Sequence, residues 1–344
     1  MSRRRVHLVG SYPAAGTSAA MTTIAEVAGP FLRSLPDGET GERSRWIVNV
    51  IDGLRDHPGL ELVKDGDYSS YDSRPLFKVR RGHRLTPDSL RLGYANVARE
   101  SYTVFRQVRA EHGLPEVSFQ VGLPGDFDLA YFAFGAAGAV RLRGVVRAAL
   151  AREIAEIAAW GGQDVVFQIE VPGELVLVEG LPRPLRAAAA RALVRGLVKQ
   201  AVVAPSGTRF GVHLCVGDLG NKALRPLGSA SALVALVKAL LRYWPQGRPL
   251  EYVHVPLAAG DQPPPLDENF YRGLSALAGM PSRVRFVAGL AHEGQDAGEQ
   301  RAILERVERL LERPVDVASA CGLGRRSPQD ARRALERAAA LAET

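Results

Sequence analysis

Cysteine, lysine and long apolar runs are all scarce in this chain, and two of these shortages exclude whole classes of protein. Only Cys215 and Cys321 occur among 344 residues, which is too few for the disulfide framework of a small secreted domain. No apolar run approaches the ~20 residues of a membrane-spanning helix, and the apolar run near the start is too short for a signal peptide. We therefore expect a cytoplasmic protein with reduced thiols and no membrane partner.

Basic charge comes almost entirely from arginine. The formal net charge is +7, and only five of the 44 basic residues are lysines. The arginines are scattered along the polar sides of predicted helices, and no homeodomain, zinc-finger or RNA-binding motif accompanies them. This pattern favours a solvated arginine-rich surface over a nucleic-acid partner. An apolar content of 46% also excludes a chain that is disordered throughout.

Short β-rich runs alternate with amphipathic helical stretches along most of the chain. Apolar residues recur at helical spacing over residues 140–160, 185–203, 230–243 and 300–312, and Ser327, followed by Pro328 and Asp330, is typical of a helix start. Strands that alternate with helices indicate a parallel sheet, and eight such units indicate a (β/α)8 TIM barrel formed by residues 1–344 as one domain. A doubly wound sheet is the competing fold, but no Gly-x-Gly-x-x-Gly follows the first strand. The eight predicted strands are residues 6–10, 31–35, 117–122, 164–170, 209–215, 251–256, 283–290 and 315–320.

The second and third predicted strands are too far apart to be joined by one helix alone. Residues 65–86 between them are polar, contain tyrosine and show no helical period. Helices are predicted on either side, near residues 43–54 and 87–112. We interpret residues 55–115 as an insertion that acts as a lid over one mouth of the barrel.

Polar residues are concentrated where the predicted strands end, which is the side of a TIM barrel that carries the active site. His213 and Cys215 lie two residues apart on one strand, so their side chains share a face. Cys321 ends the last strand. A His-Cys-Cys set suits Zn2+, whereas the alternative is two buried free cysteines and a hydrogen-bonded histidine.

Other strand ends carry candidate catalytic and substrate-binding groups. Glu170 lies in an otherwise apolar strand, where a carboxylate is costly unless it is paired or functional. His254 and His292 follow apolar strand residues and are either core groups or members of the site. The end of the first predicted strand, an acidic glycine-containing loop and the end of the last predicted strand add further candidates, which are Ser11, Asp37, Glu39, Arg43 and Arg325. Glu39 suits an ammonium group, and the two arginines suit an anion; a simple turn is the alternative for the loop.

These strand ends, in this order, resemble the catalytic barrel of cobalamin-independent methionine synthase. The run GSYP at 10–13 is similar to the family's Gly-Ser-Phe-Pro turn, and DGETGER at 37–43 to its His-Gly-Glu-x-Glu-Arg segment, with one residue inserted and Asp37 in place of the histidine. QIEVP at 168–172 is similar to Gln-Ile-Asp-Glu-Pro, with Val171 in place of the second acid. HLC at 213–215 and CGL at 321–323 match the segments that carry the zinc ligands. The resemblance covers the chain as one barrel, against two in the family's enzyme, and is nearest to a single-barrel group.

The resemblance implies a zinc-dependent transferase that activates a thiol substrate for methyl transfer, with a folate-type donor as one option. Zinc would be held by His213, Cys215 and Cys321, and His254 would take the place of the family's glutamate ligand, which this chain lacks on the sixth strand. Glu39, with Ser11, would bind an amino-acid-like thiol. Glu170 and His292 would handle the proton on the donor side.

A metal-independent lyase or decarboxylase of the uroporphyrinogen-decarboxylase-like type is the alternative function. It would use Arg43, Arg325 and Glu170 on an anionic small molecule. A non-catalytic binding barrel is a third interpretation. In each case we expect a small-molecule ligand and a monomer or homodimer.

Overall fold

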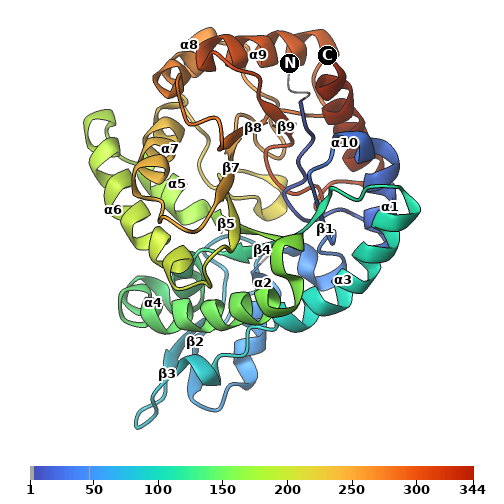
Figure 1. The fold of residues 1–344 in the computed structure, drawn as a ribbon. Coiled ribbons are helices and arrows are strands. Elements are labelled where there is room, and N and C mark those ends of the chain that lie inside the picture. The colour runs from blue at the N-terminus through green and yellow to red at the C-terminus, as the bar shows by residue number, and fades with distance from the viewer. Residues whose placement is uncertain (1–3, 46) are drawn as a thin grey trace.

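The centre of the molecule is a curled sheet of seven parallel strands. The computed structural model describes residues 4–45 and 47–344. All neighbouring strands of this sheet are parallel, and their order along the sheet follows their order along the chain (Figure 1). The fold is therefore α/β and TIM-like. The strands are β1 (Ser34–Pro36), β4 (Ser118–Pro124), β5 (Val165–Val171), β6 (Arg209–Leu214), β7 (Leu250–Pro256), β8 (Arg285–Gly289) and β9 (Asp316–Ala318).

Helices surround the outside of this sheet (Figure 1). Neighbouring helices pack on one another around the ring, α10 on α1, α1 on α3, α3 on α4, α4 on α6 and α6 on α7. Ser327 caps α10 by accepting a hydrogen bond from the Asp330 backbone N–H at 3.1 Å, as its sequence predicts. The helices are α1 (Thr17–Ala28), α2 (Val48–Asp52), α3 (Tyr94–Glu111), α4 (Asp126–Gly161), α5 (Pro172–Glu179), α6 (Arg183–Val202), α7 (Ser231–Tyr243), α8 (Glu268–Tyr271), α9 (Ala297–Leu311) and α10 (Pro328–Glu343).

The first predicted strand does not form as a regular strand. Val6 makes isolated parallel bridges to Leu32, shortly before the edge strand β1, and to Val317 in the other edge strand, β9. The carbonyls of the residues that follow accept hydrogen bonds from side chains inside the sheet instead: Gln120 donates to Leu8 and Val9, and Gln168 donates to Val9. Side-chain amides thus take the place of a strand ladder at these carbonyls. The prediction was a closed ring of eight regular strands, and the described residues form a sheet of seven.

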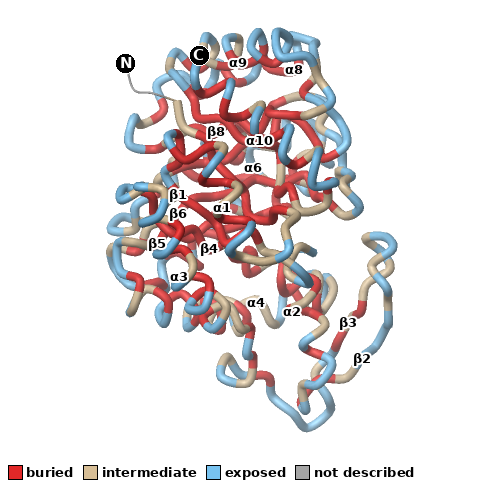
Figure 2. Tube along the Cα trace, turned by 90° about the vertical axis from the view of Figure 1, so that its right-hand side faces the viewer, coloured by how far each residue is buried: buried red, intermediate tan, exposed pale blue. Residues whose placement is uncertain are grey.

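An antiparallel hairpin interrupts the chain between β1 and β4. Its strands are β2 (Leu60–Lys64) and β3 (Leu76–Val79). The hairpin projects from the body of the molecule and is largely exposed (Figure 2), although Leu60 and Phe77 are buried and β3 contacts α4. The predicted lid region also contains α3, which packs on α1 and β4 and connects the hairpin back to the sheet.

Helix α4 is long and apolar enough, with the turn up to residue 164, to pass a length-and-composition test for a membrane span. From the sequence we expected no stretch with the length and apolar composition of a membrane span, and α4 corrects that expectation. Core helices pass the same test, and a single such helix is weak evidence. Here the helix is broken at Gly135 (φ 68°), and Arg143 and Arg147 make ion pairs with buried Asp126.

Candidate active site

A cavity of about 220 Å³ opens at the carboxyl ends of the strands. The buried, nearly continuous apolar strands β4 and β5 place their last residues at this edge of the sheet. The hairpin loop, the start of α4 and α5 supply further lining residues, many of them apolar or aromatic. Six of the predicted site residues line the cavity, namely Ser11, Glu39, Glu170, Cys215, Cys321 and Arg325.

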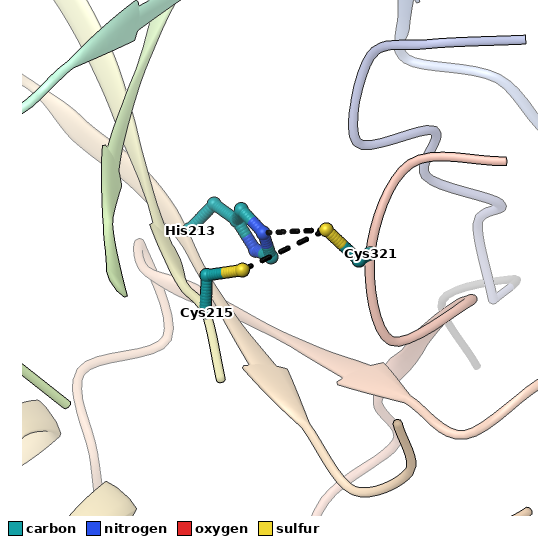
Figure 3. Close-up of side chains that lie close together, drawn as sticks. All are labelled: His213, Cys215 and Cys321. Atoms are coloured by element: carbon teal, nitrogen blue, oxygen red, sulfur yellow. Dashed lines mark hydrogen bonds between the residues drawn. The ribbon is translucent and has the colours of Figure 1, made fainter. Parts of the chain in front are cut away.

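His213, Cys215 and Cys321 form a compact cluster of nitrogen and sulfur donors (Figure 3). One ligand atom from each lies within 4.8 Å of the others. The Cys321 sulfur is 3.6 Å from the Cys215 sulfur and 3.7 Å from Nε2 of His213. Two residues of spacing on one strand put His213 and Cys215 on the same side, and Cys321 reaches them from the loop after β9 (Figure 3).

His254 is paired with His213 and does not belong to this cluster. The two histidines are register partners on β6 and β7, and their Nδ1 atoms are 2.7 Å apart. The other ring nitrogen of His254, Nε2, is 2.9 Å from the Ser319 carbonyl oxygen. Both nitrogens of His254 are therefore occupied, in contrast to the ligand position that we predicted for it.

These contacts set the tautomers of both rings. A carbonyl only accepts, so Nε2 of His254 carries a hydrogen. Burial lowers the pKa of His254 to about 4 and the pKa of His213 well below its ordinary value, so both rings are neutral. Nδ1 of His254 then accepts from Nδ1 of His213. This leaves Nε2 of His213 with its lone pair on the side of Cys321, as a metal ligand requires.

Tight backbone packing positions Cys321. Leu323 donates its N–H to the Ser11 carbonyl at 2.7 Å, and Gly324 donates its N–H to the Ser11 hydroxyl at 3.2 Å. A Cβ added at Gly324 would lie 2.7 Å from the Ser11 Cβ, so only glycine fits there without movement. Ser11 therefore holds the Cys321 loop as well as lining the cavity.

Glu39 and Glu170 face each other across Gly122. A Cβ at Gly122 would lie 2.9 Å from Oε1 of Glu39 and 3.1 Å from Oε1 of Glu170. Burial and the nearby charge of Asp37 raise the pKa of Glu39 to about 7. Burial and the charge of Glu39 raise the pKa of Glu170 well above its ordinary value. Glu170 is buried and Glu39 is partly buried, and two carboxyl groups placed against each other in this way hold at least one proton near neutral pH.

Backbone strain accompanies this carboxylate pair. Glu39 has φ of 40°, in the left-handed region that favours glycine. Its N–H donates to the Asp37 carboxylate at 2.9 Å. Strained residues of this kind cluster at functional sites, so the DGE loop is built to place one side chain.

Asp37 and Arg43 bind each other, which differs from the substrate-binding role predicted for them. The Arg43 guanidinium is 2.7 Å from Oδ2 of Asp37, and the Ser101 hydroxyl donates to the same oxygen at 2.8 Å. Because Asp37 also accepts from Glu39, these three contacts stabilise the loop that carries Glu39. Arg325 is likewise paired, with Asp218 at 2.7 Å, but it lines the cavity.

His292 is not one of the described residues that line the cavity. Its Nδ1 accepts from the Gly294 N–H at 3.0 Å, and its Nε2 is 3.2 Å from the Gly260 carbonyl oxygen. Both ring nitrogens thus have partners in the chain. The proton-transfer role predicted for His292 has no support in these contacts.

Several residues that line the cavity were not predicted from the sequence. Tyr68, Tyr71 and Arg74 come from the hairpin loop, which has no periodicity, and Tyr131 and Phe132 come from the start of α4. The Tyr71 hydroxyl accepts from the Leu219 N–H at 2.9 Å and so joins the hairpin to the loop after β6. The clustering of tyrosines in an otherwise polar segment was the only available hint.

The fold is TIM-like, and several solved structures are similar to that of this chain. It is similar to a B12-independent methionine synthase from Shewanella sp. W3-18-1 in complex with selenomethionine, with a TM-score of 0.63 and 16% identity over 99% of this chain and 97% of that one. A putative vitamin-B12 independent methionine synthase from Listeria monocytogenes gives a TM-score of 0.57 and 14% identity, over 99% and 98%. A methyltransferase from Methanosarcina mazei gives 0.51 and 14%, over 99% and 94%.

No protein-family model and no curated protein matches the sequence. The similar structures confirm the predicted resemblance to cobalamin-independent methionine synthases at the level of the fold. Identities of 14–16% support no conclusion beyond the fold.

Proposed function

We propose that this chain is a zinc-dependent transferase that activates a thiol substrate for methyl transfer. The observation that carries the proposal is the cluster of His213, Cys215 and Cys321, whose ligand atoms lie within 4.8 Å of one another beside the cavity. The fold supports it as well, since the similar structures are named as methionine synthases and a methyltransferase.

The chemistry of the three donors fits zinc. Imidazole and thiolates are ligands that Zn2+ prefers, and three protein ligands leave a position for substrate. The hydrogen bond with Cys215, together with burial, raises the pKa of Cys321 well above its ordinary value, so the Cys321 thiol stays protonated unless a cation lies beside it. When bound, zinc would lower the pKa of a substrate thiol and present it as a thiolate. His254 orients His213 for this role through the contact between their rings.

Glu39 and Glu170 are the chain's own proton carriers in the proposal. The substrate S–H gives its proton to this carboxylate pair, and the sulfur forms a bond to the methyl carbon. The bond between that carbon and the donor's leaving atom breaks, and the leaving atom takes the proton back from the pair. A carboxyl with a pKa of about 7, as for Glu39, suits both directions of transfer near neutral pH.

Ser11 and Glu39 are the groups we assign to an amino-acid-like thiol. Both line the cavity that also holds the two cysteines. A carboxylate of Glu39 would bind a substrate ammonium by a charge-assisted hydrogen bond. A folate-type methyl donor is the donor class that the resemblance implies.

The metal-independent lyase or decarboxylase has less support. The two arginines predicted for it, Arg43 and Arg325, are paired with Asp37 and Asp218. It would gain ground if the protein, purified without chelator, proved to be folded and free of metal.

Elemental analysis of the purified full chain tests the proposal. We expect about one zinc per chain in the wild type, and loss of zinc with retained circular dichroism in His213→Ala, Cys215→Ser and Cys321→Ser. His83→Ala, which removes an exposed histidine of the hairpin region, is the matched control and should keep the metal. Full zinc occupancy in either cysteine variant would show that the site is wrongly assigned.

A further inference from the structure

Arg74 is a cation in the cavity wall, and the described part of the chain gives it no anionic partner. It lies in the hairpin loop, and its Nη1 donates to the Tyr71 carbonyl at 2.6 Å. Its guanidinium lies over the rings of Tyr131 and Phe132, 5.1 and 5.3 Å from their centroids. Its Nε is buried and has no hydrogen-bond partner. Among the residues that the structure describes, no carboxylate pairs with it.

Three other arginines near the site differ from Arg74 because each has an acidic partner. Arg43, Arg325 and Arg326 all make ion pairs, with Asp37, Asp218 and Glu293. A guanidinium has five N–H donors arranged for bidentate binding of carboxylate or phosphate. Arg74 uses one of them on a backbone carbonyl and holds its plane against aromatic rings, so its remaining donors are oriented but unused.

A second arginine on the same wall has similar surroundings. Arg45 lines the cavity, and its guanidinium lies 5.2 Å from the centroid of the Tyr68 ring. No carboxylate in the described part of the chain pairs with it either. The arginine charges that act most on the pKa of Glu39 are those of Arg43 and Arg325. The cavity therefore has an acidic, thiol-bearing side at the strand ends and a separate basic side at the hairpin.

We propose that Arg74, assisted by Arg45, binds an anionic group of the substrate, at the end of an apolar body whose sulfur meets Cys215 and Cys321. The substrate class is thus an acidic thiol, with a carboxylate, sulfonate or phosphate remote from the sulfur. The apolar part of the lining suits the apolar part of such a substrate, since Val48, Ile51, Val176 and Leu177 all line the cavity. The position of the sulfur rests on the proposed function, whereas the anion site does not.

Calorimetric titration of the zinc-loaded full chain with matched probes tests this proposal. The probes are mercaptopropionate, mercaptohexanoate and the neutral mercapto-alcohols of the same lengths. We expect at least one acid to bind about tenfold or more tightly than its alcohol, because a charge-assisted pair is added. Arg74→Gln should remove this preference and leave the alcohol's Kd unchanged. Arg74→Lys, which keeps the charge but loses the fork, should keep part of it.

Controls separate the anion site from the thiol site. Arg183→Gln changes an exposed arginine on α6 and should behave as the wild type. Hexanoate, which has no thiol, should bind metal-depleted wild type more tightly than metal-depleted Arg74→Gln. Equal affinities of acids and alcohols, or an unchanged preference in Arg74→Gln, would overturn the anion site. If hexanoate discriminates but no thiol probe binds more tightly when zinc is present, the anion site stands and the proposed thiol activation fails.

Discussion

Replacement of Glu39 by glutamine should change how stability depends on pH. The folded-state pKa of Glu39 is raised from 4.5 to about 7 by burial and by the charge of Asp37. Between these two values the folded chain holds a proton that the unfolded chain has released. The free energy of unfolding therefore falls as pH rises through this window. Glu39→Gln keeps the shape of the side chain and cannot ionise, so it removes this contribution to the fall.

The magnitude follows from the difference between the two pKa values of Glu39. That difference is about 2.5, and at about 1.36 kcal/mol per pKa unit it corresponds to about 3 kcal/mol as an order of magnitude. Glu39→Gln should thus be close to the wild type at about pH 5 and more stable than it by about 3 kcal/mol at about pH 8. The charge of Glu39 is one cause of the raised pKa of Glu170. Removing that charge lowers the pKa of Glu170, so the response of Glu170 does not cancel the gain in stability at high pH.

Urea unfolding at both pH values, followed by circular dichroism and with zinc content measured at each, provides the assay. The control is Glu42→Gln, which changes an exposed carboxylate of the same loop and should show no such pH-dependent gain. If the difference between Glu39→Gln and the wild type is the same at both pH values, the carboxylate pair is not buried and opposed as the structure has it.

Three further variants test the surroundings of the metal cluster. His254→Ala should keep zinc at saturation but weaken its affinity about 10- to 100-fold in chelator competition, the usual effect of losing a group that orients a ligand; complete loss of zinc would restore His254 as a ligand. Gly324→Ala should cost about 1–3 kcal/mol in thermal unfolding because its Cβ meets Ser11 at 2.7 Å, whereas Gly144→Ala, where a Cβ meets nothing within 4 Å, should be neutral or stabilising. His292→Ala should lower stability, since it breaks the contacts to Gly260 and Gly294, and leave turnover per folded molecule unchanged; selective loss of turnover would contradict this.

The parallel sheet and the composition of the site could be predicted from local patterns. Seven of the eight predicted strands form, because apolar runs of this length bounded by turns have few other stable arrangements in an alternating chain. The pairing of His213 with Cys215 follows from the two-residue period of a strand. Cys321 could be added because the carboxyl ends of parallel strands meet at one edge.

The failed expectations concern contacts between segments far apart in the chain. The first strand looked like any other apolar run, and only the interior amides of Gln120 and Gln168 decided that its carbonyls would bind side chains. A hydrogen bond or ion pair forms between whichever groups the packing brings together, and composition does not specify that choice.

The α/β fold and the residue types at the strand ends follow from local periodicity and from the order of elements along the chain, so both can be predicted from the sequence. The partners of each side chain at those ends follow from the three-dimensional packing. The packing pairs His254 with His213, places Glu39 against Glu170, and gives Arg74 no carboxylate partner in the described part of the chain. Ligand geometry, pKa and charge pairing depend on separations of a few ångströms between residues that can lie dozens to hundreds of positions apart.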